Sequence, residues 1–405
     1  MLYLHSSMKK PTISPKAIIL STVFLDVVGI GLIIPVLPSY VESFGVSHLA
    51  VTALFAVFAL CAFLSSPILG VISDRKGRRP VLLVSLASSA VGWLIFAFSH
   101  SVVGLFIGRI IDGSAAGNLP TAQNYLVDIS KDEKERGQNL GLIGAVFGIA
   151  FIIGPLVGGL LSSFYKPLPF IVVGFLAVIN TILAYFFLPE THHEHNPEKM
   201  SWNPFAPLAK AMKSKTLTPL YIAWLLFGIA ASANQSVFAL YLQAKFSWGV
   251  IAAGTMMAVV GIVISINQAV LIKKFWLKRF SPAMLNLWLL VPFAIGYVVM
   301  ALPYKWVFVL GLIVTAFGQS VYRVTMTSQT VGKASKMEQG ETMGVLASLM
   351  SLSMVIGPLL GGLVYGYALP APFYLSAIIL AVAFVLLYRA NIKTPPMDIP
   401  GVQAI

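Results

Sequence analysis

Four charged side chains stand inside long apolar stretches of the sequence: Asp26, Arg109, Asp112 and Arg323. An ionised side chain at the centre of a bilayer costs about 2.5–3.5 kcal/mol on insertion scales, so each of them requires a reason. Arg109 and Asp112 are three residues apart on one helix face and can pair. That pair is either a neutralised structural contact or a carboxylate whose affinity for protons changes as Arg109 approaches and leaves. Asp26 has no partner nearby in sequence, and we predict that Asp26, Arg109 and Asp112 form a proton-coupling group.

The apolar stretches around these charges predict membrane-spanning helices. The chain of 405 residues is 58% hydrophobic and only 10% charged, and a spanning helix needs about 20 apolar residues. We expect an all-α membrane protein with twelve transmembrane helices in two six-helix bundles, 1–190 and 218–405, joined by a cytoplasmic loop over 191–217. The expected spans are 17–38, 50–72, 80–99, 102–126, 138–161, 168–188, 218–242, 250–273, 282–302, 306–328, 340–365 and 371–389.

The second half of the chain repeats a pattern of the first. Residues 135–160 and 338–363 share glycines and a Gly-Pro pair at matching positions, 203 residues apart. Apolar segments that recur in two halves are typical of a transporter whose site lies between two structural repeats. The substrate is then a small molecule that moves through the membrane.

The distribution of cations predicts the orientation. The net charge is +13, and most of the 27 Lys and Arg residues fall in alternate connections between the expected helices. Cytoplasmic loops of membrane proteins carry this excess, so both termini are expected on the cytoplasmic side. The membrane is expected to be a bacterial inner membrane or another plasma membrane. These cations face membrane lipid, and because they are scattered over many loops they do not predict nucleic-acid binding.

Other chemistry finds no support in the sequence. A Gly-x4-Gly-Lys-Ser/Thr loop is missing, so we expect no nucleotide and no ATP-driven transport. Cys61 is the sole cysteine, which excludes an internal disulfide. His192, His193 and His195 lie in the polar loop and are interpreted as solvated rather than as a metal site. We expect no cofactor, no enzymatic activity and a monomer.

One loop resembles a known family. The pattern Gly-x3-Asp-Arg-x-Gly-Arg-Arg over residues 70–79 resembles the signature loop of the major facilitator superfamily. The resemblance implies that Asp74 and Arg75 take part in a charge network that closes the cytoplasmic side, with Asp128 as a further member. The predicted cytoplasmic gate comprises Gly70, Asp74, Arg75, Gly77, Arg78 and Asp128.

Two further elements resemble the drug/proton antiporter branch of that family, notably the tetracycline-resistance efflux proteins. Gly108-Arg109 resembles a buried element of the fourth helix, and the glycine series ending in Gly154-Pro155 resembles the antiporter element of the fifth. Glycines let backbones touch and a proline bends a helix, so this series predicts a hinge. The predicted hinge residues are Gly144, Gly148, Gly154, Pro155, Gly158, Gly357 and Pro358. Unlike the tetracycline antiporters, the chain has no acid at 90–93 or 291–297.

The resemblance also implies which helices line the central cavity. Polar or charged residues of those helices are the candidates for substrate binding: Asn118, Gln123, Asn234, Gln235, Gln268, Gln319, Tyr322 and Arg323. Phenylalanines and methionines of the same helices, Met354 among them, would form an adaptable apolar wall. The favoured function is a proton-coupled antiporter that exports drug-like or amphipathic molecules by alternating access. The alternatives are a proton-coupled importer of a small metabolite and an uncoupled or receptor-like protein of the same fold.

Overall fold

The computed structural model describes residues 14–191, 214, 216–334 and 338–393, and over these ranges the regular structure is helical. Nearly all of the expected loop 191–217, with its histidines, lies outside the described residues. The helices of the first half are α1 (Pro15–Glu42), α2 (His48–Lys76), α3 (Arg78–Phe98), α4 (Val102–Ser114), α5 (Asn118–Asp128), α6 (Glu133–Phe164) and α7 (Leu168–Phe187). Those of the second half are α9 (Thr218–Phe246), α10 (Val250–Ile266), the π-helix η1 (Asn267–Trp276), α11 (Leu277–Arg279), α12 (Pro282–Trp288), α13 (Leu290–Met300), α14 (Lys305–Lys333), α15 (Gln339–Tyr365) and α16 (Ala371–Lys393).

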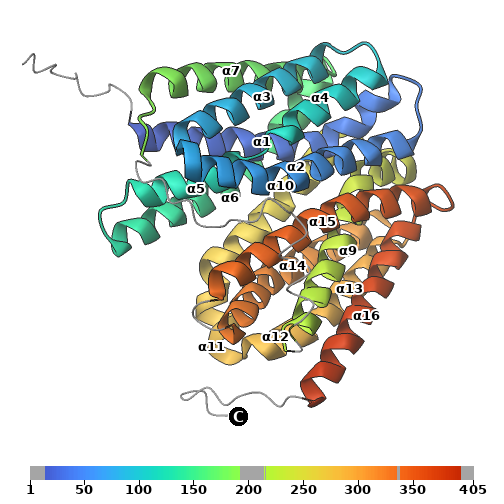
Figure 1. Ribbon diagram of the computed structural model, residues 1–405. Coiled ribbons are helices and arrows are strands. Elements are labelled where there is room, and N and C mark those ends of the chain that lie inside the picture. The colour runs from blue at the N-terminus through green and yellow to red at the C-terminus, as the bar shows by residue number, and fades with distance from the viewer. Residues whose placement is uncertain (1–13, 192–213, 215, 335–337, 394–405) are drawn as a thin grey trace, which may run out of the picture.

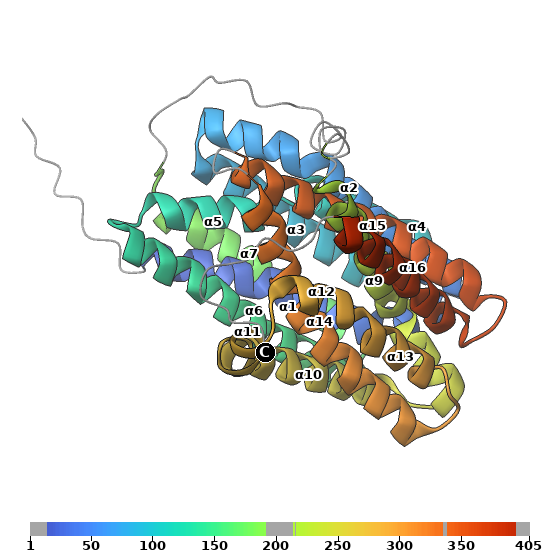
Figure 2. The ribbon, with the colours of Figure 1, turned by 90° about the horizontal axis from the view of Figure 1, so that it is seen from below.

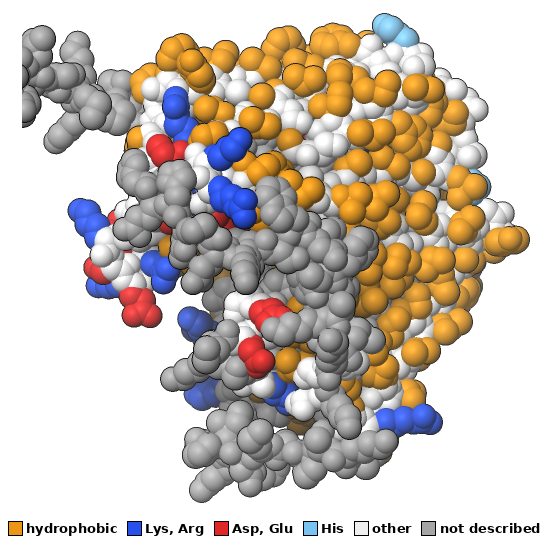
Figure 3. Space-filling view, viewed as in Figure 1, with side chains coloured by type: hydrophobic (Ala, Val, Ile, Leu, Met, Phe, Trp, Pro, Cys, Tyr) orange, Lys and Arg blue, Asp and Glu red, His pale blue; other side chains and the backbone are white. Residues whose placement is uncertain are grey.

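These helices form twelve segments that are long and apolar enough to span a membrane. Helices α4 and α5 make up the fourth segment, α10 to α11 the eighth, and α12 with α13 the ninth. Six segments form one bundle and six the other, so the predicted fold class is confirmed (Figure 1). A space-filling view shows a broad hydrophobic surface over both bundles, while the Lys and Arg side chains in sight gather mainly toward one end (Figure 3).

The fourth segment is broken, although the sequence pattern predicted one helix over 102–126. Residues 115–117 leave the helical conformation, and Pro120 has no N–H to donate to the carbonyl of Ala116. Serines of α2 satisfy two of the freed carbonyls: Ser65 Oγ donates to Gly113 O over 2.9 Å, and Ser66 Oγ to Ala116 O over 3.1 Å. A break in a spanning helix is tolerated where a neighbouring helix supplies such donors.

The two bundles meet at one end and separate at the other. We call the end that holds the turns after α2, α5, α11 and α14 the basic end, because Arg75, Lys131, Arg279 and Lys333 lie there. At the opposite end Gln243 Nε2 donates to Glu42 Oε2 across the bundles over 3.1 Å, and His48 packs on Tyr365. The bundles diverge from these contacts toward the basic end, as Figures 1 and 2 show together.

A stripe of glycines along one face of α6, from Gly137 to Gly159, shows this divergence. From Gly148 onward the stripe touches α10: a Cβ on Gly148 would lie 3.1 Å from Ser265 Oγ, and one on Gly159 would lie 2.9 Å from Val250 O. Nearer the basic end the same stripe continues through Gly144, Gly141 and Gly137, where an added Cβ would meet no atom within 4 Å. The bundles are therefore closed at the opposite end and open at the basic end.

Candidate transport site

A cavity lies between the bundles, on the basic-end side of the contacts that join them at the opposite end. It encloses about 760 Å³ of atom-free space, its open mouth included, and its wall is mostly apolar. Both bundles contribute to the wall, and α1, α2, α9 and α15 each contribute several residues to it. The lining residues are Ile30, Ile33 and Ile34 of α1; Leu54, Phe55, Phe58, Ala59 and Ala62 of α2; Arg109 of α4; Ser232, Gln235 and Ser236 of α9; and Ser351, Met354 and Pro358 of α15.

Arg109 is the charged residue of this wall. Its guanidinium lies within 4.3 Å of the Trp93 ring centre, 5.1 Å of that of Phe96 and 5.3 Å of that of Phe58. Arg109 Nη2 and Asp112 Oδ2 are 3.2 Å apart, and both residues are buried. The predicted pairing of Arg109 with Asp112 is thus present, within a cage of three aromatic rings that attracts a cation through the ring faces.

Close packing of α3 on α4 holds this pair in place. A Cβ on Gly92 would lie 2.8 Å from Gly108 O, and a Cβ on Gly108 would lie 2.8 Å from Gly92 O. Because the backbones touch at these two glycines, Arg109 must lie beside Trp93, which follows Gly92 in the chain. Glycine pairs of this kind are a usual way for membrane helices to approach.

Asp26 has the partner that its neighbouring sequence lacks. Asn118, the first residue of α5, donates from Nδ2 to Asp26 Oδ1 over 3.1 Å. Asn118 was predicted as a substrate contact, and this bond joins it to the half-buried Asp26 carboxyl. The break in the fourth segment thus positions a polar amide against the acid of α1.

The other predicted substrate contacts divide into three groups. Gln235 lines the cavity, as does Met354 of the expected apolar wall. Asn234 instead donates to Ala230 O over 3.0 Å and to Ser376 Oγ, and Tyr322 is buried against Trp224 and Phe227. Gln123, Gln268 and Arg323 are exposed and Gln319 is half-buried, outside the wall of this cavity.

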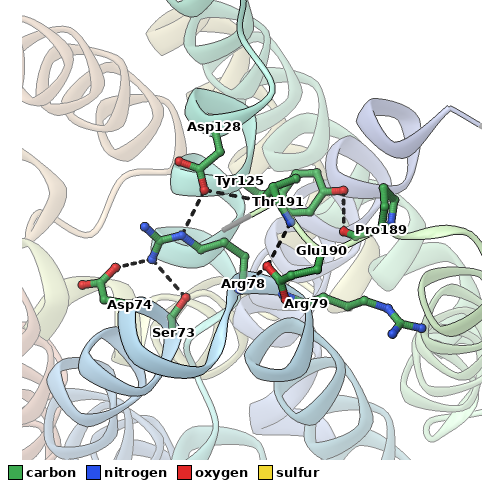
Figure 4. Close-up of polar contacts among 9 residues, drawn as sticks. All are labelled: Ser73, Asp74, Arg78, Arg79, Tyr125, Asp128, Pro189, Glu190 and Thr191. Atoms are coloured by element: carbon green, nitrogen blue, oxygen red, sulfur yellow. Dashed lines mark hydrogen bonds and ion pairs between the residues drawn. The ribbon is translucent and has the colours of Figure 1, made fainter. Parts of the chain in front are cut away.

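The residues over 70–79 form a charge network at the basic end (Figure 4). Arg78 is its centre: Nη1 contacts Asp74 and donates to Ser73 Oγ over 3.1 Å, while Nε lies 3.1 Å from Asp128 Oδ2. Asp74 and Asp128 thus lie in one network, and the cation that contacts both of them is Arg78 rather than Arg75, which the resemblance had named. Asp74, Arg78 and Asp128 all belong to the first bundle, so the contacts among these three residues organise that bundle.

Glu190 is a further member of the network that the predicted gate omitted. Its carboxylate accepts from the backbone N–H of Arg78 over 2.8 Å and of Arg79 over 3.1 Å, at the start of α3. An acid there satisfies free N–H groups and complements the helix dipole. Gly77 adopts φ of 105°, and a side chain at that position would also collide with Glu190. The signal in the sequence was Leu188-Pro189-Glu190 at the end of the first half. In the structure Tyr125 donates to Pro189 O over 2.9 Å, which fixes this segment.

The repeated glycine pattern has the same packing role in both halves. A Cβ on Gly154 would lie 2.8 Å from Val28 O of α1, and one on Gly357 would lie 2.8 Å from Ile229 O of α9. These two glycines therefore hold α6 and α15 against the first helix of their own bundle. The last glycines of the pattern face the other bundle: Gly159 meets α10 and Gly362 meets Thr52 of α2.

Comparisons with known proteins agree with this fold. The sequence profile of the Major Facilitator Superfamily matches residues 19–301 and 269–404. The chain is 30% identical over 355 residues to the tetracycline resistance protein, class C, of Escherichia coli, covering 86% of this chain and 89% of that protein. It is 31% identical over 380 residues to multidrug resistance protein 1 of Bacillus subtilis (strain 168), covering 91% and 94%. The crystal structure of the nucleoside transporter NupG superposes with a TM-score of 0.76 at 15% identity, over 95% of this chain and 100% of that one.

The chain therefore belongs to the Major Facilitator Superfamily. It is a multi-pass membrane transporter for small molecules and not an enzyme. The curated relatives named above are bacterial proteins of tetracycline and multidrug resistance.

Proposed function

We propose that this protein is a proton-coupled antiporter that exports amphipathic small molecules by alternating access. The observation that carries the proposal is the cavity between the bundles, whose apolar wall includes Arg109, itself paired with Asp112. An apolar wall with few polar groups suits amphipathic molecules of varied shape. The names of the relatives support export, and the antiporter-like glycine series of α6 supports exchange.

Asp26, Arg109 and Asp112 are the proposed proton-coupling group. Asp26 and Asp112 are the carboxyl groups of the described residues that lie well inside spanning segments. A carboxyl group in that position is costly unless it is paired, and in transporters such groups relay protons. A change in the distance between Arg109 and Asp112 as the bundles move would bind or release a proton. One proton charge that crosses 100 mV supplies about 2.3 kcal/mol for uphill export.

The moving bodies are the bundles 1–190 and 218–405, connected by 191–217, and the basic end faces the cytoplasm together with both termini. The gate residues Gly70, Asp74, Arg75, Gly77, Arg78 and Asp128 then control access from the cytoplasm. Gly144, Gly148, Gly154, Pro155 and Gly158, with Gly357 and Pro358, form the hinge. The protein acts as a monomer because each chain contains both halves of the cavity.

The test is substrate-induced proton release from purified protein in proteoliposomes, with ethidium as the probe. The wild-type protein releases protons when ethidium is added and accumulates ethidium against a gradient when a pH difference is imposed. Variants Asp26→Asn and Asp112→Asn lose both responses but still exchange ethidium down its gradient. Glu133→Gln, which removes an exposed acid at the start of α6, serves as the control and retains both responses.

Two results would contradict the proposal. Ethidium accumulation that persists after the pH gradient is collapsed would exclude proton coupling. Proton release by the double variant Asp26→Asn/Asp112→Asn would place the coupling group elsewhere. Orientation is tested separately: in a Cys61→Ser background, a cysteine at Lys134 must react with a membrane-impermeant thiol reagent in inverted vesicles and not in intact cells.

A further inference from the structure

Arg323 is a cation inside a spanning helix whose guanidinium makes no ion pair or hydrogen bond with any described residue. It lies ten residues before the end of α14, about 15 Å from the basic end at 1.5 Å per residue. Its side chain is exposed. Between residues 218 and 393 the acids are Glu338 and Glu341, which lie at the basic end where α15 begins. The second bundle therefore offers Arg323 no carboxylate at its own depth.

The neighbours of Arg323 along α14 fix the direction in which it points. Val321, two residues before Arg323, packs with Leu285 and Leu289. Thr325, two residues after Arg323, donates from Oγ1 to Asn286 Oδ1. These partners lie on α12 or next to it. Residues two apart on a helix point about 160° from each other. Arg323 consequently points away from α12.

The flanking positions show what lies on either side of this direction. Tyr322 packs on Trp224 and Phe227 of α9, with ring centres 6.5 and 4.7 Å apart. Ser320 accepts from Asn267 at the start of η1, which continues α10. Both α9 and α10 also contact α1 of the first bundle. The face of α14 that carries Arg323 lies between α9 and the α10–η1 segment and is thus turned toward α1, into the space between the bundles.

A molecule that arrives from the basic end passes Arg323 before it reaches the apolar cavity. The cavity residues Ile30 and Ile34 of α1 lie fifteen and nineteen residues from Pro15, or about 22 and 28 Å from the basic end. Arg323, at about 15 Å, lies nearer that end, at the depth of Asp26 on the facing bundle.

We propose that Arg323 binds an anionic group of the transported molecule, a carboxylate by preference, on its path from the basic end to the cavity. The proposal rests on the proposed export function and adds a substrate class: amphipathic molecules that carry a carboxylate. A guanidinium presents paired N–H donors that match the two carboxylate oxygens. An unpaired arginine in a spanning segment also gains stability when such a partner arrives, which supplies the driving force for capture.

A matched pair of dyes tests this assignment. Rhodamine 110 carries a free carboxyl group, and rhodamine 123 is its methyl ester. Binding of both is measured by fluorescence anisotropy on purified protein in nanodiscs of phosphatidylcholine, and transport is followed in proteoliposomes. Arg323→Gln should weaken binding of rhodamine 110 about tenfold and leave binding of rhodamine 123 within twofold. Arg323→Lys should give an intermediate preference for the acid, since it keeps the charge but loses the paired N–H donors. Lys333→Gln, at the end of the same helix, is the control and should change neither affinity.

Each other outcome overturns the proposal. Equal losses for both dyes would assign Arg323 a structural or gating role, and unchanged affinities would exclude it from binding. An effect that appears only when phosphatidylglycerol is added to the nanodiscs would identify a lipid phosphate as its anion. If the wild-type protein exports ethidium but does not prefer rhodamine 110, this inference fails and the proposed function stands. Absence of proton-coupled export of both ethidium and rhodamine 110 would instead refute the proposed function.

Discussion

Asn118 and Asp26, 92 residues apart in the chain, are joined by a hydrogen bond of 3.1 Å between Asn118 Nδ2 and Asp26 Oδ1. The bond connects the broken fourth segment to α1, which also contributes three isoleucines to the cavity wall. Any movement of α5 against α1 therefore changes the surroundings of the Asp26 carboxyl directly. This connection provides a route by which the fourth segment influences the proposed proton site.

The first prediction concerns this hydrogen bond. Asn118→Ala should lower uphill ethidium export at least tenfold while downhill exchange continues, because the Asp26 carboxyl loses the donor that orients it. The measurement is the ratio of uphill to downhill flux in proteoliposomes. Thr22→Ala is a matched control, since it removes a different interhelical bond of α1, the 2.8 Å bond from Asn180 Nδ2. Each change costs about 0.5–1.5 kcal/mol of stability, so similar flux ratios in the two variants would contradict the prediction.

The second prediction concerns the buried pair. Asp112→Leu leaves Arg109 without its counterion, and the loss of one partner of a buried ion pair destabilises a protein by about 3–5 kcal/mol. The double variant Arg109→Met/Asp112→Leu removes both charges, so it should recover most of that stability. Thermal unfolding of detergent-solubilised protein provides the measurement. Proton release should be lost in both variants, and a stable double variant that still couples ethidium to protons would show that the pair is structural only.

The spans of the fold could be predicted from the sequence, whereas the extent of the break in the fourth segment could not, although Pro120 removes one helical N–H donor there. Twelve apolar stretches follow directly from the need to satisfy the backbone within lipid. The break at 115–117 depends on Ser65 and Ser66, whose hydroxyls reach the freed carbonyls from another helix. Sequence spacing carries no information on such a contact, so the pattern predicted a continuous helix.

The candidate site was predictable where its contacts are local. Arg109 and Asp112 lie on one helix face, and their pairing followed from that spacing alone. Asn234 and Gln235 are adjacent polar residues, yet Gln235 lines the cavity while Asn234 is satisfied by Ser376. The difference arises from the rotation of α9 relative to its neighbours, which packing determines and which a single sequence does not reveal.

The third prediction concerns the network around Arg78. Asp74→Asn should reduce the turnover of ethidium export about tenfold and change its binding affinity less than twofold, because Asp74 lies at the basic end and outside the cavity. Binding on purified protein and initial export rates measure the two quantities. Glu190→Gln weakens the cap of α3, an effect of about 0.5–2 kcal/mol. It should lower the unfolding temperature with a smaller effect on turnover, and a collapse of affinity in Asp74→Asn would contradict a gating role.

The fourth prediction uses the glycine stripe of α6. Gly141 and its repeat equivalent Gly344 lie at the basic end, where an added Cβ would meet no atom within 4 Å. Gly159, farther along the stripe of Gly141, already touches α10. If the bundles rock, the open part of the stripe must approach the other bundle when the basic end closes. Leucine at Gly141 and Gly344 is then compatible with the present conformation and incompatible with the closed one.

Spin labels on cysteines at Lys134 and Lys278, in a Cys61→Ser background, measure the separation of the bundles at the basic end. The parent protein should show a long and a short distance, and Gly141→Leu/Gly344→Leu should show the long distance alone and lose ethidium export. Gly141→Ala/Gly344→Ala is the control, because a methyl group leaves room for approach, and it should keep both distances. Leucine at Gly159 should act in the opposite sense, since its side chain would collide with Val250 and favour the short distance. A short distance that persists in the Gly141→Leu/Gly344→Leu variant would show that the bundles close by a movement other than rocking about this stripe.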